Sequence, residues 1–154
     1  MPVVIQIKGL EELEAGVGAG VVEMQAAVKG AMTASVNTVM IKARELAPYK
    51  TGTLRRSIYT EVTEGGLRGM VAQDTNIAPY GPMLEFGTAP HDIYPVNKKA
   101  LYWAGASSPF RHVFHPGISP RPFMMPALQE STDKIIAYFK VALDKVVLTM
   151  SGKL

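Results

Sequence analysis

The longest regular pattern in this sequence is a series of apolar side chains at three- and four-residue spacing between residues 21 and 46. This spacing gathers them on one face of an α-helix of about 25 residues. Pro48 ends the helix, because the residue before a proline is kept out of the α region. A helix this long is a spine for a chain of 154 residues, and we expect a sheet to pack against it.

A second apolar stripe, Leu128–Val147, predicts another helix close to the end of the chain. It is expected to begin near Phe123–Pro126, since proline is tolerated in the first turn of a helix, and to end at Ser151–Lys153. At the other end of the chain, the glycines within Gly16–Gly20 interrupt the approach to the long helix. They predict either a break or a helix that packs closely at its glycines.

Short segments of β-branched or alternating residues predict strands. They are residues 2–7, 57–63, 68–74, 99–104 and 111–114. The turn Glu64–Gly66 predicts an antiparallel hairpin of the second and third strands, and the last two are expected to pair with each other. The order of elements predicts an α+β fold, with both helices packed on a small, mainly antiparallel sheet. The length favours a single domain over residues 1–154.

Two segments rich in proline and glycine, residues 77–95 and 115–122, predict long loops with a short turn of helix at Met83–Phe86. Such loops are usually functional or ordered by partners. Both carry apolar side chains, which favour aggregation when exposed on a monomer and stabilise an interface when a neighbouring subunit covers them. We expect contacts between subunits at Tyr80, Met83, Phe86, Ile118, Phe123, Met124 and Met125. The alternative is that both loops fold back onto their own sheet as core.

Several classes of chemistry lack their sequence signals. The absence of cysteine excludes disulfide scaffolds, thiolate nucleophiles and Cys-ligated metal sites. Val21 stands where a GxGxxG fingerprint needs its third glycine, and neither a phosphate-binding loop nor a GxSxG elbow is present. We therefore expect no catalytic residue and no cofactor. Without a secretory signal or a run of ~20 apolar residues, intracellular assembly away from membranes is expected.

Glu85 is a single acid in an apolar, proline-rich stretch of the chain. A buried glutamate needs partners, and Arg55, Arg56 or the hydroxyl of Thr88 could supply them. We therefore expect Glu85 to form a buried structural pair rather than to act as a base.

The three histidines, His91, His112 and His115, offer the chemistry of metal ligands. A strand over residues 111–114 would, however, point His112 and His115 to opposite faces. We expect a structural or solvent-facing role for them and no metal site. A metal-dependent hydrolase is the competing hypothesis, which bound metal would support.

The net charge is only +3, but its distribution is uneven. Acids gather between Glu11 and Glu23, whereas residues 93–129 hold four Lys and Arg and no acid. This asymmetry suits a surface that meets an acidic partner. The chain's aromatic residues near cations also permit single-strand binding, although Tyr102 and Trp103, in an apolar strand, are expected in the core.

Four blocks of the sequence together resemble one family of proteins. They are Ala43–Ile58 (AxxxAPxxTGxLRxSI), Ala78–Thr88 with its EFGT, Ile93–Leu101, and His115–Leu128 with HPG and PFxxPAL. In this order they resemble a tailed-phage neck family, catalogued as a phage tail-component protein of the Hong Kong 97 gene-ten type. The resemblance extends from about Leu10 to Leu143, and so covers nearly the whole chain.

The resemblance implies a structural virion protein rather than an enzyme, assembled in the bacterial host cytoplasm. Members sit at the head–tail junction, where a ring of copies (a hexamer or dodecamer is expected) joins a head-closure or connector protein to a tail terminator or tail tube protein. Packaged DNA passes through the lumen. Cations expected to face the lumen or an acidic neighbour are Arg55, Arg56, Lys98, Lys99 and Arg111. The alternatives are a tail terminator or minor capsid component and, in another class, a small basic nucleic-acid-binding protein.

Overall fold

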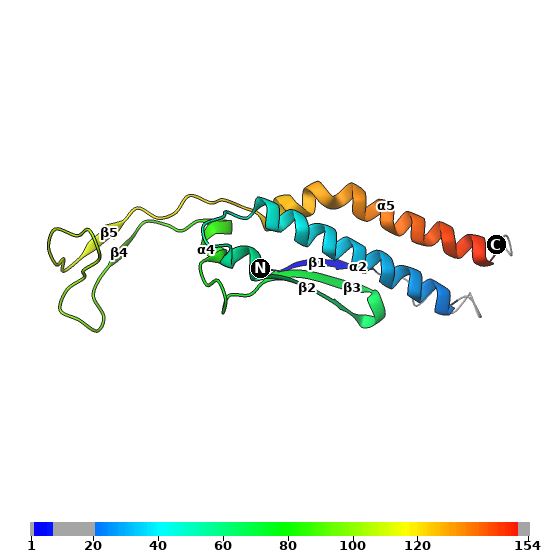
Figure 1. The fold of residues 1–154 in the computed structure, drawn as a ribbon, viewed down its shortest axis with the longest axis horizontal. Coiled ribbons are helices and arrows are strands. Elements are labelled where there is room, and N and C mark those ends of the chain that lie inside the picture. Colours follow the sequence, from blue (N-terminus) through cyan, green and yellow to red (C-terminus); the bar gives the residue numbers. More distant parts are fainter. Residues whose placement is uncertain (1, 8–20, 151–154) are drawn as a thin grey trace.

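Two long antiparallel helices form the spine of the molecule. The computed structural model describes residues 2–7 and 21–150, and in it α2 (Val21–Leu46) lies along α5 (Met124–Met150), as Figure 1 shows. The two helices make the most extensive contact between any two elements of the described chain. The predicted helix over residues 21–46 is confirmed, and the C-terminal helix begins where its prolines and apolar stripe predict.

A three-stranded antiparallel sheet packs on α2. Its strands are β1 (Val3–Gln6), β2 (Ile58–Thr63) and β3 (Arg68–Gln73), in the order β1-β3-β2. The turn between β2 and β3 is a 3₁₀ segment, η2 (Glu64–Gly66), so the predicted hairpin is confirmed. Both helices and this sheet together confirm the expected α+β fold, with the long helices packed on a small sheet.

The hairpin lies unusually close to α2 because glycine occupies the contact points. A Cβ atom added to Gly69 would lie 2.5 Å from Val36 Cγ1 and from Met32 Sδ. One added to Gly66, which has a φ of 107°, would lie 2.6 Å from the Cα of Lys29. Only a residue without a Cβ permits this approach of backbone to helix.

The main core fills the space between the sheet, α2 and the start of α5. Its largest fully buried side chains include Phe123 from the approach to α5, Met32 and Val39 from α2, and Ile58 and Val71 from the sheet. A smaller cluster of Met24, Val28 and Val146 closes the far end of the helix pair. The core therefore depends on residues from both ends of the described chain.

The remaining elements are short and differ in part from the sequence prediction. Helix α3 is Thr53–Arg56 and α4 is Gly81–Phe86, which extends the predicted turn of helix. Strands β4 (His91–Ile93) and β5 (Val113–His115) pair with each other. The prediction that residues 99–104 form a strand was wrong: a single bridge joins Leu101 to Phe110. Residues 101–103 lack the alternation of a half-buried strand, and no core lies against them.

The expectations for Gly16–Gly20 and for a helix end at Ser151–Lys153 lie outside the described residues. No helix in the described part of the chain has the length and apolar character needed to cross a bilayer.

Candidate assembly interface

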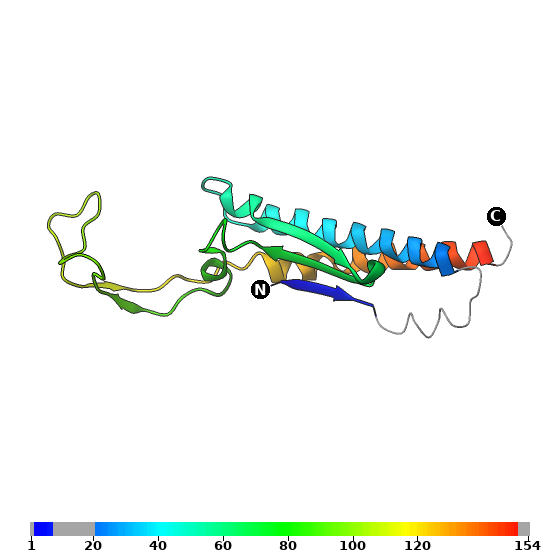
Figure 2. The same cartoon turned by 90° about the horizontal axis from the view of Figure 1, so that it is seen from below.

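Residues 88–121 leave the body as a long arm. Figures 1 and 2 show from two directions that it projects beyond the ends of α2 and α5 and that its tip lies apart from the sheet. Strands β4 and β5 hold its two sides together in antiparallel register, with Ile93 opposite Val113. The two predicted loop segments therefore remain mostly irregular, but short stretches of each pair across the arm, at His91–Ile93 with Val113–His115 and at Thr88 with Ile118.

The root of the arm is a second antiparallel contact. Thr88 and Ile118 pair through two backbone hydrogen bonds, of 3.0 and 3.2 Å between nitrogen and oxygen. Gly87 and Gly117 flank this pair with φ values of 73° and 87°. Backbone atoms of the opposite side occupy the space that a Cβ would need at either glycine. The two sides of the arm thus leave the body already paired.

Contacts of the three histidine rings link the two sides of the arm near β4 and β5. The imidazole of His112 lies 2.6 Å from a carboxylate oxygen of Asp92, and its ring lies 5.1 Å from the ring of Tyr94. His91 and His115, opposite each other in the register, stack with their ring centroids 5.1 Å apart. These contacts give the three histidines structural partners. No group of three His, Asp or Glu side chains within residues 2–7 and 21–150 is placed to hold a metal ion.

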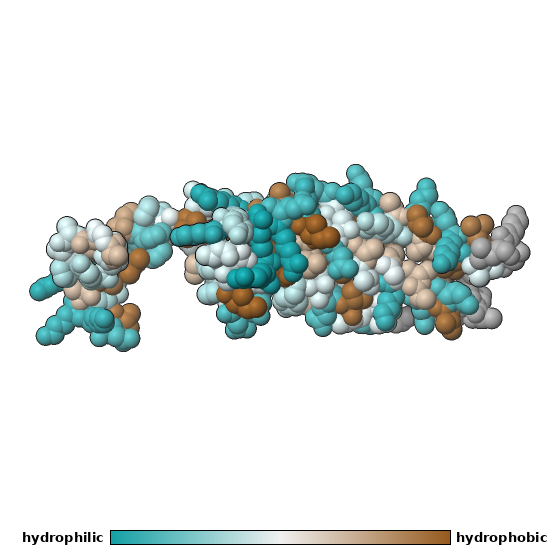
Figure 3. Space-filling view, in the orientation of Figure 1, coloured by the Kyte–Doolittle hydropathy of each residue, from teal (hydrophilic) through white to brown (hydrophobic). Residues whose placement is uncertain are grey.

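Large apolar side chains project from the arm into solvent. Val96 is 93% exposed, Phe114 61% and Trp103 49%, and Tyr94 and Tyr102 are also exposed. The expectation that Tyr102 and Trp103 lie in the core was wrong, because the arm carries them away from it. Trp103 stacks on Phe110 within the arm instead. Figure 3 shows apolar surface on the arm as well as along the body. The sequence-based prediction missed these residues as interface candidates, although Tyr94 lies inside the first proline-rich segment and the others lie between the two segments.

Five of the seven predicted interface residues are exposed, and two are not. Tyr80, Met83, Phe86, Ile118 and Met125 each expose a third or more of their surface. Phe123 and Met124 expose 1% and 4%, because Phe123, just before α5, and Met124, its first residue, both pack into the main core. They are therefore core residues of the single chain and not surface anchors.

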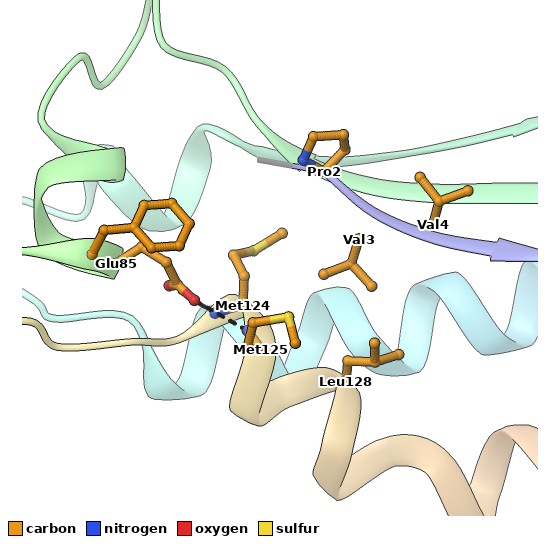
Figure 4. A pocket seen from close by; sticks show the side chains of 8 residues that line it. Pro2, Val3, Val4, Glu85, Met124, Met125 and Leu128 are labelled. Atoms are coloured by element: carbon orange, nitrogen blue, oxygen red, sulfur yellow. Dashed lines mark hydrogen bonds between the residues drawn. The ribbon is translucent and has the colours of Figure 1, made fainter.

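Phe86 and Met125 come together at an apolar pocket of about 160 Å³ between α4, α5 and β1. Figure 4 shows the side chain of Val3, on the edge strand β1, directed toward Met125 and Leu128 of α5, whereas Val4 projects from the other side of the strand. Tyr80 lies elsewhere, in a larger groove near the turn that follows α2. The exposed candidates therefore lie in at least two separate places on the body.

Glu85 is buried, as expected, but its partners are not the predicted arginines. Its carboxylate accepts hydrogen bonds from the backbone N–H groups of Phe123, Met124 and Met125, at 2.7, 3.0 and 3.2 Å. These are amides at the start of α5, which have no partner within the helix and lie at its positive end. Figure 4 shows two of these bonds. Glu85 thus holds α4, at the root of the arm, against the start of α5.

The five predicted cations divide between two regions. Lys98, Lys99 and Arg111 are exposed on the arm, and Arg56 is exposed on the body at the end of α3. Arg55 is engaged on the body, where it donates hydrogen bonds to the carbonyls of Ala47 and Glu45 and lies 5.0 Å from the ring of Tyr49. Arg55 therefore caps the end of α2, and the structure does not gather the five cations on one surface.

The larger groove has a basic lining. Its volume is about 520 Å³, and its walls come from Pro48–Gly52 after α2, from Tyr80 and Leu84 at α4, and from Arg121 where the arm returns. Of the residues that the structure describes, Lys50 and Arg121 are the charged ones in its lining, and no acid is among them. The arrangement is suited to binding an acidic group beside an apolar one.

No protein-family model matches the chain, and the searches of curated proteins and of solved structures also found no match.

Proposed function

We propose that this protein is a structural subunit that assembles with copies of itself through the arm, and that the assembly is a ring at the head–tail junction of a tailed-phage virion. The observation that carries the proposal is the arm itself. A paired hairpin with several large apolar side chains in solvent is costly on a monomer and useful when a neighbour covers it.

The exposed residues Phe86 and Met125 extend the apolar surface onto the body. An arm on one copy and an apolar pocket on another make a contact between unlike surfaces, and head-to-tail contacts of this kind give a ring where the rotation between copies closes. The sequence resemblance supplies the specific setting: a neck or tail-completion ring between a connector and the tail, in passive contact with DNA. A tail terminator or a minor capsid component would use the same mode of assembly. On this proposal the protein acts by shape and not as a catalyst.

The single tryptophan makes the proposal directly testable. Trp103 lies on the arm and is half exposed, so its emission reports whether a neighbour covers it. We expect the purified protein to have a mass several times 16.7 kDa, and its emission to shift to the red on dilution to monomer. The Val96→Asp/Phe114→Asp variant should remain folded but become monomeric, because both side chains are exposed on the arm.

The matched control is Val141→Asp, a similar change at an exposed position on α5. It should leave the mass unchanged. A wild-type protein that stays monomeric at high concentration and with connector or tail proteins would refute the proposal. Equal loss of assembly in the control would show that the contact is not specific to the arm.

One observation favours nucleic-acid binding as a second candidate. The arm carries Lys98, Lys99, Arg111 and Arg121 but a single acid, Asp92, and exposes Tyr102 and Trp103 beside these cations. Such a surface can bind single strands by stacking and charge. Quenching of Trp103 by an oligonucleotide, with an affinity that falls steeply as salt rises, would support this function. Assemblies that survive nuclease treatment unchanged would favour the structural role.

A further inference from the structure

The basic groove lies at one end of the body, and its cations have no partner there. Lys50 and Arg121 form no ion pair with any residue of the ranges 2–7 and 21–150. Tyr49, Tyr80 and Leu84 give the same groove an apolar wall. A ligand that fits must therefore offer both negative charge and apolar side chains.

We propose that this groove binds the acidic segment Leu10–Glu14 of a second copy of this chain. The inference rests on the proposed self-assembly and adds a second contact to the one made by the arm. The segment reads Leu-Glu-Glu-Leu-Glu, and outside its three glutamates no five consecutive residues of the chain hold more than two acids. Its three carboxylates complement Lys50 and Arg121, and its two leucines match the apolar wall.

The covalent chain prevents this contact within one copy. The groove begins just after Leu46, at the end of α2, and the 26 residues of that helix span about 39 Å. Glu14 is seven residues before Val21, and seven extended residues reach at most about 25 Å, so the segment as a whole cannot lie in the groove of its own copy. The segment is attached at one end of α2 and the groove lies beyond the other, so the donor must be another molecule.

The contact that follows is heterologous, because one copy contributes its acidic segment and the next contributes its groove. Repetition of such a contact gives a ring where the rotation closes. The charges also fix the direction of assembly, since two grooves repel each other and so do two acidic segments.

A peptide tests the groove without requiring assembly. Residues 9–16, as a synthetic peptide, should bind the full-length protein in calorimetry, and more weakly as salt increases. The Lys50→Glu/Arg121→Glu variant should bind the peptide at least about tenfold more weakly than the wild type, because both groove charges become repulsive. The control variant Lys98→Glu/Lys99→Glu changes the net charge equally but lies on the arm, and should bind the peptide like the wild type. Equal binding by both variants, or no binding of the peptide at millimolar concentration, overturns the proposal.

Charge exchange tests the contact within the assembly. Reversal of the groove alone, or of Glu11, Glu12 and Glu14 to lysine alone, should lower the mass of the assembly. Both reversals in one chain should restore it, because neighbours become complementary again. If each reversal alone lowers the mass and the combination does not restore it, the pairing is wrong. If the wild type assembles and neither reversal changes the mass of the assembly, this inference fails while the arm-based assembly stands. If the wild type is monomeric but binds the peptide, the groove proposal stands while the arm-based assembly fails.

Discussion

The carboxylate of Glu85 and the backbone amide of Phe123 form a hydrogen bond of 2.7 Å, although 38 residues separate them in the chain. The whole arm lies between these two positions. This bond and its neighbours at Met124 and Met125 fasten both ends of the arm to the same point of the body.

Replacing Glu85 should therefore destabilise the fold. Hydrogen bonds to a charged group contribute about 1.5–3 kcal/mol each in favourable cases, and buried amides left without a partner add a penalty. We expect Glu85→Ala to lower the free energy of unfolding by about 2–4 kcal/mol, and Glu85→Gln by less, since an amide oxygen still accepts. Urea unfolding measures both. The control Glu61→Gln, at an exposed position of β2, should change stability little. No loss in Glu85→Ala would contradict the role of this cap.

Phe123 should behave as a core residue. Truncation of a buried phenylalanine costs about 3–5 kcal/mol, because it removes buried apolar surface and leaves a cavity. We expect Phe123→Ala to fall in this range in thermal or urea unfolding. Phe86→Ala, at a side chain that is 57% exposed, should leave monomer stability nearly unchanged. A mild effect at Phe123 would mean that its burial contributes little.

Two glycines, one beside α2 and one within it, should have opposite effects on stability when each is replaced by alanine. A Cβ at Gly69 would collide with Met32 and Val36, so Gly69→Ala should cost about 1–3 kcal/mol through overpacking. Gly30 lies within α2, and no described residue outside its own helix turn comes within 4 Å of a Cβ added to it. Gly30→Ala should stabilise the protein by about 0.5–1 kcal/mol, because glycine is a poor helix former. If both variants changed the free energy of unfolding in the same direction, the close approach of Gly69 to α2 would not be what decides the effect of a methyl group there.

One ion pair links the two long helices and should be sensitive to alkali. The hydrogen bond to Glu130, 2.8 Å away, raises the pKa of Lys42 above its ordinary value of 10.5. Because the folded pKa is the higher one, the stabilisation is complete below the unfolded pKa and is lost as pH rises through the folded pKa. We expect a small decrease in melting temperature at strongly alkaline pH that is absent in Lys42→Met. An equal decrease in both proteins would assign the effect to other groups.

The elements with strong local signals could be predicted from the sequence. The periodic apolar face of residues 21–46, the proline after it and the Glu64–Gly66 turn specify their structure within a few residues of chain. The burial of Glu85 could also be predicted from its neighbours. Its true partners could not, because they are backbone amides that long-range folding brings to it.

The arm shows where local patterns stop being informative. Leu101, Tyr102 and Trp103 are as apolar as a core strand, and only the position of the core decides whether they are buried. Phe123 presents the reverse case, since its proline-rich surroundings suggested an exposed loop while α5 draws it inward. The pairing of β4 with β5 depends on register across some twenty residues, and no short motif announces it.

The glycines at the root of the arm have a consequence for how the molecule tolerates change. Gly87 and Gly117 leave no space for even one methyl group between the two paired backbones at the root of the arm. Any side chain there would wedge the paired strands apart and swing the distant tip through a wide arc. The orientation of the arm relative to the body therefore depends on the absence of a Cβ atom at these two glycines.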